Sequence, residues 1–381
     1  MIDTTKLMLN KNMFWITDIS LFQKERQNAA RGYFTLVQNP TKSELLNKIY
    51  KPRLTLTKRF NTSGYFEETL SVELSLTKML FKNNFDELHG QNSELVEIVE
   101  LLSNVLKTMG VRVFNHVLTT APVSSIHYSK NIPLTDGSTP SYYISKIKES
   151  NVTLALDVEE DKYRNDGHGY KWHCNSYEVA FYDKIKELRI AKKSDKRTFE
   201  KDSAIQLNLF DELQTRKMFE VLRMEVRLNN RQKIKQLFKI LSIQSNLTLQ
   251  DLFSSLISQK VLLYYLDELE RQRPTILDYK PASSKDLLAS LIIGNPKLGL
   301  RQVLQMHDLN YLLETITFRE LRDMFGKYSI RSWQRLIADT KRLNLPKSQS
   351  PFTLIRNHLT QFKPLKLVDF QDEMINNDKY N

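Results

Sequence analysis

A tyrosine and a lysine two residues apart are the side chains in this sequence best suited to chemistry. Tyr182 and Lys184 lie in the β-prone segment 176–184, where side chains alternate between the two faces of a strand. The spacing predicts both on one face, with Glu178 and Ala180. A phenolate oxygen attacks phosphorus when its charge is stabilised, and a neighbouring ammonium would stabilise it. The ordinary interpretation is a surface tyrosine beside a solvated lysine, which the local pattern alone favours.

Three further strand segments carry side chains of the kinds that bind metal ions. Two carboxylates and an imidazole suit Mg²⁺ or Mn²⁺, and such an ion would polarise a phosphodiester while the phenol attacks. Each residue also has an ordinary interpretation, as a hydrogen-bonded sheet histidine or as a glutamate that is solvated or paired with arginine. The predicted ligands are Glu73 in the alternating segment 70–76, His127 in 123–128 and Glu225 in 221–228.

The elements that must position these residues indicate an α+β fold. Alternating apolar segments predict antiparallel strands through residues 1–240, with helices at 91–109 and 142–149 and a strand at 111–118. After about 240 the period becomes helical, so we expect a nicking domain at 1–240 and an all-helical domain at 241–381. The expected helices are 231–242, 248–272, 284–293, 299–305, 308–315, 318–326 and 330–344. The last two, 318–344, resemble a helix-turn-helix.

The charge of the chain suggests a polyanionic partner. Its 381 residues carry a formal net charge of +12, for which nucleic acid is the first candidate. A charge run at 189–203 reads either as a solvated loop or as phosphate contact through Lys192 and Lys193. The other residues predicted to contact DNA are Arg223 and Arg227 on the strand of Glu225, and Arg331 and Arg335 in the helix-turn-helix candidate.

Composition limits the remaining classes of protein. With 41% hydrophobic residues the chain is long and apolar enough to build a core. The single cysteine, Cys174, excludes an intrachain disulfide framework and a zinc cluster of cysteines. The sequence shows neither a signal-peptide pattern at Met1 nor a long apolar run, so we expect a cytoplasmic protein with no membrane partner.

The chain also resembles a known family, the gene II/X replication initiators of filamentous phages and related plasmids. The likeness consists of short segments that follow the family's order over most of the chain, and none of them is specific alone. They are the opening Met1-Ile2-Asp3; Val72-Glu73 with Lys78, Leu80 and Asn84, similar to VEI…AKVL…N; 123–127, similar to ISRID; 180–188, similar to AYLKHVEL; 222–227, similar to VRFEARI; 333–349, similar to WRYVSALVECGIPKSQ; and Val368-Asp369-Phe370.

The resemblance implies a rolling-circle initiator. Such a protein nicks one strand of a duplex origin through a tyrosine, keeps a 5′-phosphotyrosine link, leaves a 3′-OH primer and rejoins the displaced strand. The phosphotyrosine bond conserves energy, so rejoining needs no nucleotide, which agrees with the lack of a GxxxxGK[ST] phosphate loop in the sequence. Expected partners are the single-stranded nick site, the duplex origin, a host helicase and a single-strand-binding protein.

Two departures from the family and two alternatives remain. His127 stands where the phage members carry Asp, and the His-hydrophobe-His metal motif of many rolling-circle initiators is absent. A non-catalytic origin-binding protein would have the same charge and the same helix-turn-helix candidate, but would not need Tyr182 and Lys184 beside three potential ligands. A relaxase or transposase that uses the same tyrosine chemistry would need the same residues.

Overall fold

The structure is a computed structural model, and it describes most of the chain. The described residues are 1–28, 33–41, 43–44, 47, 49–60, 66–150, 162–164, 168–173, 175–187, 220–325, 328–346 and 350–366. The segments that carry Lys192 and Lys193 and the predicted strand 152–156 lie outside them.

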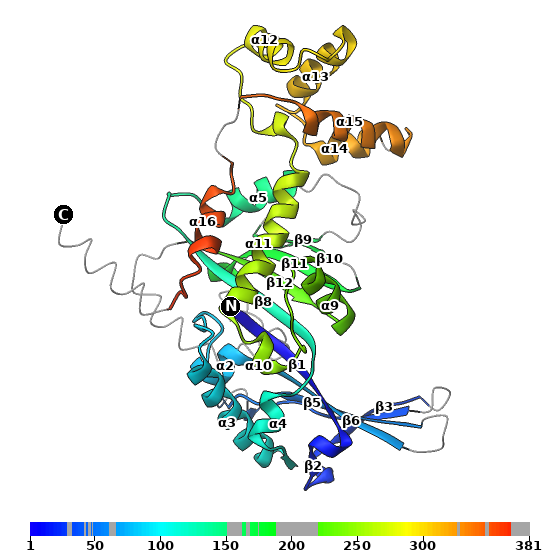
Figure 1. Ribbon diagram of the computed structural model, residues 1–381, viewed down its shortest axis with the longest axis vertical. Coiled ribbons are helices and arrows are strands. Elements are labelled where there is room, and N and C mark those ends of the chain that lie inside the picture. The colour runs from blue at the N-terminus through cyan, green and yellow to red at the C-terminus, as the bar shows by residue number, and fades with distance from the viewer. Residues whose placement is uncertain are drawn as a thin grey trace, which may run out of the picture.

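A ten-stranded antiparallel sheet forms the centre of the protein (Figure 1). The short strands β2 (Trp15–Ile16) and β7 (Val111–Arg112) pair separately. The strands of the large sheet, in spatial order, are β3 (Gln23–Asn28), β4 (Tyr33–Gln38), β5 (Arg53–Phe60), β6 (Phe66–Ser75), β1 (Ile2–Asn10), β8 (Val123–Leu134), β12 (Glu220–Leu228), β11 (Tyr177–Asp183), β10 (Gly169–His173) and β9 (Lys162–Arg164).

The helices lie around this sheet and beyond one end of it (Figure 1). Most of them begin and end close to the positions that the apolar period predicts, but the two helices predicted at 299–305 and 308–315 are one continuous helix, Leu300–Leu312. They are α2 (Leu76–Phe81), α3 (Asn92–Thr108), α4 (Asn115–Thr119), α5 (Pro140–Ser150), α9 (Arg231–Ile240), α10 (Leu249–Leu252), α11 (Ser255–Gln272), α12 (Ser284–Gly294), α13 (Leu300–Leu312), α14 (Phe318–Met324), α15 (Ile330–Arg342) and α16 (Thr353–Gln361), with 3₁₀ turns η1 (Lys11–Met13), η2 (Ile19–Leu21) and η6 (Thr275–Leu277).

The predicted α+β fold is confirmed, and the alternation of β11 and β12 gives the predicted faces. Val179 pairs with Val226 and Phe181 with Met224, and these buried apolar side chains belong to the main core. The residues between them point to the opposite face, because neighbours on a strand alternate. The predicted strand at 111–118 is wrong beyond Arg112: β7 is two residues long, and α4 begins at Asn115.

Two separate apolar cores divide the described chain. The first joins the sheet to α3, α5, α9, α10, α11 and α16, with Leu262 and Leu359 among its buried side chains. The second is built from residues 276–345, including Leu291 and Ile337. The predicted boundary after residue 240 therefore differs from the division of the cores, because α10, α11 and α16 cover the sheet rather than belonging to the separate helical unit.

The helical unit is attached to the first core through the end of α11. Arg273 follows α11, is buried, and donates to Ser150 Oγ at 2.6 Å and to Asp278 Oδ1 at 2.7 Å. The chain returns to the first core at α16, where Arg356 pairs with Asp267 and Glu270 of α11. None of the helices among the described residues is long and apolar enough to span a membrane.

Candidate active site

The phenol of Tyr182 points to the carboxylate of Glu225 on the neighbouring strand. Antiparallel pairing of β11 with β12 sets Ala180 opposite Glu225 and Tyr182 opposite Arg223, so Tyr182 and Glu225 are diagonal neighbours on one face. Tyr182 is partly exposed, and its hydroxyl donates to Glu225 Oε2 at 3.0 Å. Strand alternation predicts both residues on a polar face but does not predict this contact.

Glu225 is held by an arginine and faces a histidine. Arg227 donates to Glu225 Oε1 from Nε at 2.9 Å and to Oε2 from Nη2 at 3.2 Å. His127, which pairs with Arg227 across β8 and β12, has its Nδ1 3.6 Å from Glu225 Oε1. Glu178 approaches the far side of the guanidinium, 3.0 Å from Arg227 Nη1. The Tyr182 phenol and the His127 imidazole therefore both lie against the Glu225 carboxylate.

The surroundings push the pKa values of these groups apart. Burial alone would raise the pKa of the Glu225 carboxyl, but the charge and hydrogen bonds of Arg227 hold that pKa well below its usual range. Burial raises the pKa of the Tyr182 phenol far above its usual value, and the Glu187 and Glu225 carboxylates add to the rise. Burial lowers the pKa of His127. At neutral pH the site therefore holds a phenol, a carboxylate and a neutral imidazole.

Lys184 lies near Tyr182, but it is buried and stands one residue beyond β11, in the helical turn 184–187, rather than on the strand as predicted. It is fully buried, and its Nζ lies 5.8 Å from the centroid of the Tyr182 ring and 3.3 Å from Glu187 Oε2. Burial lowers the pKa of Lys184 to about 8, and the charge of Arg223 adds to this effect. Lys184 is therefore a cation at neutral pH that is ready to lose its proton in mild alkali.

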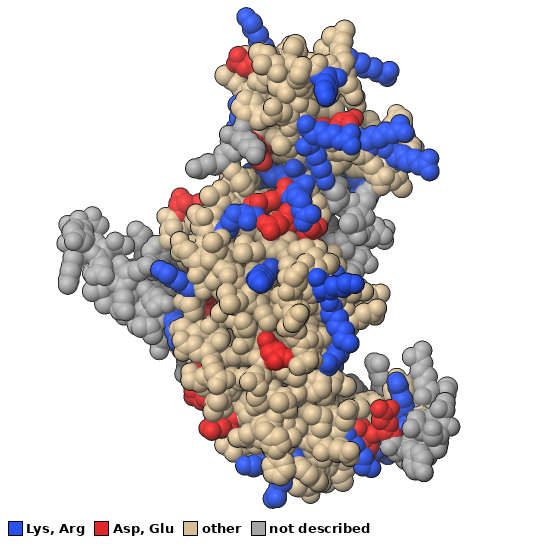
Figure 2. Space-filling model, viewed as in Figure 1, with Lys and Arg blue, Asp and Glu red and all other residues tan. Residues whose placement is uncertain are grey.

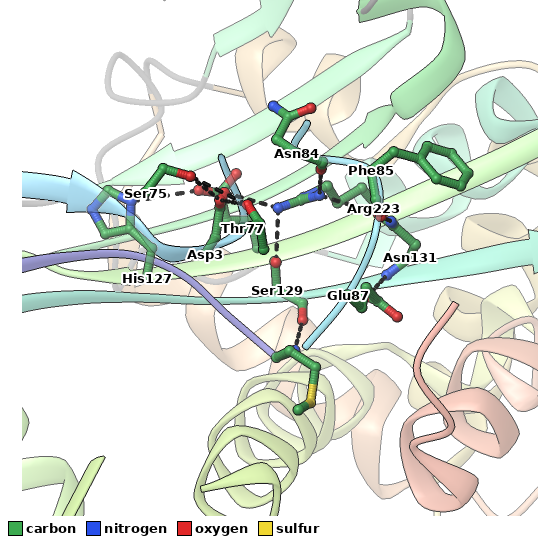
Figure 3. Close-up of polar contacts among 12 residues, drawn as sticks. Asp3, Ser75, Thr77, Asn84, Phe85, Glu87, His127, Ser129, Asn131 and Arg223 are labelled. Carbon is green, nitrogen blue, oxygen red and sulfur yellow. Dashed lines mark hydrogen bonds and ion pairs between the residues drawn. The ribbon is translucent and has the colours of Figure 1, made fainter. Parts of the chain in front are cut away.

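Arg223 is predicted to contact DNA, and the structure corrects this prediction. The side chain is 2% exposed. Its guanidinium donates to Asp3 Oδ2, Ser129 Oγ and the carbonyl oxygen of Asn84, each at 2.8 Å (Figure 3). Alternation along β12 identifies the face on which Arg223 lies, but not that β1 and the loop after α2 supply partners that enclose it. Arg223 is a buried structural cation on the same face as Tyr182, beside the site.

Asp3 is a site residue that the alternation and spacing of polar side chains do not predict. Its carboxylate binds Arg223, and its Oδ1 also accepts from Ser75 at 3.4 Å and Thr77 at 3.3 Å (Figure 3). Asp3 and Arg223 are 220 positions apart in the chain. The sequence holds one signal that could have pointed to Asp3: the opening Met1-Ile2-Asp3 is one of the segments that resemble the gene II/X family.

The three predicted metal ligands do not form one ligand set as the side chains lie. His127 and Glu225 are neighbours, but both Glu225 oxygens accept from Arg227. Glu73 is exposed on β6, which β1 separates from β8. Within the described part of the chain no group of three or more His, Cys, Asp and Glu side chains could hold a metal ion. The Glu73 carboxylate does act on His127 through its charge.

The remaining residues predicted to contact DNA lie in different environments. Arg227 is occupied by Glu225 and Glu178. Arg331 and Arg335 are exposed on α15, one helical turn apart. Figure 2 shows Lys and Arg side chains gathered over α14 and α15, with few acidic side chains among them. The predicted helix-turn-helix therefore presents a basic face to solvent.

Comparisons with known proteins add one structural likeness. No family model matches the chain, and no curated protein matches it. Among solved structures, a rolling circle replication initiator protein from Geobacillus stearothermophilus is similar over 92% of this chain and 98% of that chain, with a TM-score of 0.29 and 10% sequence identity. At this TM-score the likeness carries no argument about the fold or the site.

Proposed function

We propose that the protein is a rolling-circle replication initiator that nicks and rejoins DNA through Tyr182. The observation that carries the proposal is the hydrogen bond from the Tyr182 hydroxyl to Glu225, with the Lys184 ammonium beside the ring. A phenol, a carboxylate that accepts its proton and a nearby cation are the groups that tyrosine attack on phosphorus requires. The ordered resemblance to the gene II/X family and the net charge of +12 support DNA as the substrate.

In the proposed reaction Tyr182 Oη forms a bond to phosphorus while the bond from phosphorus to the 3′-oxygen breaks. The phenol proton passes to Glu225 Oε2, and the departing 3′-oxygen takes a proton from solvent. The 5′-oxygen remains on phosphorus, which gives a 5′-phosphotyrosine link and a free 3′-OH. Lys184 offsets the negative charge that develops at the phenol oxygen and the phosphate. Rejoining is the reverse reaction with a new 3′-OH.

Arg227 and Arg223 act as positioning residues in this proposal. Arg227 fixes both oxygens of Glu225, which holds Oε2 toward the phenol. Arg223, anchored by Asp3 and Ser129, places a second buried charge next to the site. These cations keep Glu225 ionised at neutral pH, which leaves Oε2 able to accept the phenol proton, and they also make the carboxylate a weaker base.

Dependence on Mg²⁺ or Mn²⁺ is a further part of the proposal. His127 and Glu225 are donors of the required kinds, and Mg²⁺ usually keeps several waters while it binds one or two carboxylates and a substrate phosphate. A bound ion would polarise the phosphate. Because the predicted ligands do not converge as the side chains lie, no step of the mechanism above uses the ion.

The test is a covalent adduct on a denaturing protein gel. Wild type, Tyr182→Phe and Tyr177→Phe are mixed with single-stranded oligonucleotides tiled across the region next to the gene, with Mn²⁺ or with EDTA. We expect a shifted band with wild type and with Tyr177→Phe, whose ring packs against Tyr265 at 5.4 Å on the other face of β11, and no band with Tyr182→Phe.

Each of the other outcomes contradicts a different part of the proposal. An adduct that survives in Tyr182→Phe moves the nucleophile and rejects the assigned mechanism. An adduct that forms equally in EDTA rejects the metal dependence alone. Tight duplex binding with no adduct on any oligonucleotide favours the non-catalytic origin-binding protein.

A further inference from the structure

An exposed aromatic cluster lies on the small β2–β7 sheet, away from Tyr182. Trp15 of β2 is 51% exposed, and Phe114, just before α4, is 59% exposed. Their rings meet edge to face with centroids 5.2 Å apart. The exposed His116 ring stacks on Phe114, with centroids 5.7 Å apart and planes 16° apart. Three adjacent rings therefore present π surface to solvent.

The backbone beneath these rings is fixed. Trp15 pairs with Arg112 across β2 and β7. Thr17 N–H donates to the carbonyl oxygen of Gly110 at 2.8 Å, and Ser103 Oγ donates to the carbonyl oxygen of Val113 at 3.2 Å. Gly110 has φ +73°, and a Cβ there would meet the Asp18 carbonyl oxygen at 2.9 Å. The turn after α3 thus fixes both short strands, with Trp15 on β2 and with Phe114 and His116 in the segment that follows β7.

A cation lies next to the aromatic cluster, and two more lie on the elements that adjoin it. Arg112 pairs with Trp15, Lys11 is the first residue of η1 between β1 and β2, and Lys107 lies in the last turn of α3; all three are exposed. Figure 2 shows Lys and Arg side chains at the lower end of the molecule, where Figure 1 places β2. One acidic residue, the exposed Asp18, also lies close to β2 in the chain. Rings next to guanidinium and ammonium groups match a ligand that has flat bases and a charged backbone.

We propose that Trp15, Phe114 and His116 form a base-stacking platform for single-stranded DNA, with Arg112 on the backbone phosphates. Bases of any sequence stack on exposed aromatic rings, and cations beside the rings follow the phosphates. The inference deepens the proposed function, on which it rests for the choice of nucleic acid. It assigns the single strand a binding site apart from the bond that is cut.

The platform lies at the far end of β1 from the tyrosine site. Asp3, near the start of β1, contacts Arg223, whereas Asn10 at its end leads into η1 and β2. A nine-residue strand spans roughly 30 Å. DNA that is long enough to reach both sites should therefore bind more tightly than a short oligonucleotide that reaches only Tyr182.

The first measurement is fluorescence anisotropy with labelled oligo-dT and with an abasic oligonucleotide of equal length and charge. Each lost stacking contact should weaken oligo-dT binding by about 10-fold, so Trp15→Ala and Phe114→Ala should each do so. Neither change should alter binding of the abasic strand. The matched control is Tyr311→Ala, on α13, whose ring is 68% exposed and which should bind like wild type.

A second readout follows the ring itself. Oligo-dT should quench the tryptophan fluorescence of wild type and should not quench that of Trp15→Phe, because Trp172 is 6% exposed and Trp333 packs in the second core. Equal binding of oligo-dT by wild type and both alanine variants would overturn the platform, as would equal affinity of wild type for abasic DNA. A platform that serves a protein partner instead would give the same negative result.

The stacking platform and the nicking reaction are tested by separate assays, so either one can be rejected without the other. Platform variants should still form the Tyr182 adduct on the shortest oligonucleotide that supports it. If no adduct forms with any DNA but oligo-dT still quenches Trp15, the proposed reaction is rejected and the platform stands. If the adduct forms but the quench is absent, the platform is rejected and the reaction stands. Unchanged thermal melting of the variants confirms that they fold.

Discussion

The Tyr182 phenol and the Glu225 carboxylate share one hydrogen bond, 3.0 Å long, although their surroundings move their pKa values in opposite directions. The phenol pKa is raised and the carboxyl pKa is lowered, so the proton rests on the phenol before DNA binds. Groups with such divergent environments are typical of sites where a proton moves during a reaction. In the proposed reaction the proton would move to Glu225 only as the phenol oxygen bonds to phosphorus, because bond formation lowers the affinity of that oxygen for its proton.

Glu225→Gln should slow adduct formation by roughly 10²- to 10⁴-fold, the usual contribution of a general base. The amide keeps the shape of the carboxylate but accepts no proton, so the phenol must lose its proton to solvent. The rate of the variant should therefore rise with pH, whereas that of wild type should not, since Glu225 stays ionised. The measurement is the single-turnover rate of adduct formation from pH 6 to 9.

Glu178→Gln is the matched control for that experiment. Glu178 touches the same arginine, 3.0 Å from Arg227 Nη1, but does not contact the phenol. The rate of adduct formation by Glu178→Gln should stay within a few-fold of the wild-type rate. Equal losses in the two variants would show that the charge balance of Arg227 matters rather than proton transfer to Glu225.

Lys184→Met should make the protein more stable and less active. The pKa of Lys184 is lowered from about 10.5 to about 8, so the folded protein bears a cost of about 3 kcal/mol wherever the lysine is charged in both states, which is below pH 8. Between pH 8 and 10.5 Lys184 is protonated in the unfolded chain but not in the folded protein. The free energy of unfolding of wild type therefore rises toward that of the variant as pH rises. Urea unfolding of both proteins at pH 7 and at pH 10 measures the difference.

Activity supplies the other half of that prediction. If the Lys184 ammonium stabilises the developing charge, the wild-type rate of adduct formation should fall as pH rises through about 8. The Lys184→Met variant should be slow at every pH and should lack this fall. A variant as fast as wild type at pH 7 would remove Lys184 from the mechanism, whatever its stability.

Alternation in the sequence predicts the faces of β11 and β12, but not the register that brings Glu225 to Tyr182. It does not predict what lies above each face. Arg223 and Glu225 have the same pattern in sequence, yet Arg223 is enclosed by Asp3, Ser129 and Asn84, and Glu225 lies against Arg227 and the phenol. Asp3 and Ser129 come from β1 and β8, and Asn84 comes from the loop after α2, so the enclosure of Arg223 depends on a sheet order that differs from the order in the chain.

The helices show the same limit at the level of domains. An apolar stripe marks each of α11 and α15 as amphipathic, but the period is the same whichever core the stripe faces. Leu262 of α11 packs in the core of the sheet, whereas Ile337 of α15 packs in the helical unit. The change from strands to helices near residue 240 therefore does not coincide with the division of the cores.

Arg223→Met should lower the free energy of unfolding by roughly 3–5 kcal/mol, because it leaves the Asp3 carboxylate buried without its cation. Adding Asp3→Asn to this variant should recover part of the loss, since the uncompensated charge is then gone. Urea unfolding of the two single variants and the double variant forms the cycle. A loss below 1 kcal/mol for Arg223→Met would mean that the buried pair is not formed in solution.

Arg331→Ala and Arg335→Ala should weaken binding to duplex DNA and leave adduct formation on single strands unchanged. Both side chains are exposed on α15, outside the core that contains Ile337. Each arginine that neutralises a phosphate contributes about one to the slope of log affinity against log salt, so each variant should reduce that slope by about 1. Anisotropy with an origin-containing duplex between 50 and 200 mM salt measures it.

Arg301→Ala, an exposed arginine on α13, is the control for α15. It lies in the same helical unit, and its removal changes the net charge equally. If all three variants lose the same slope, the DNA responds to the overall charge of the unit and α15 has no special role. If only Arg331→Ala and Arg335→Ala change the slope, α15 contacts the DNA phosphates. If a changed origin sequence also abolishes the difference in affinity between these variants and wild type, α15 contacts bases as well, because phosphate contacts carry no sequence information.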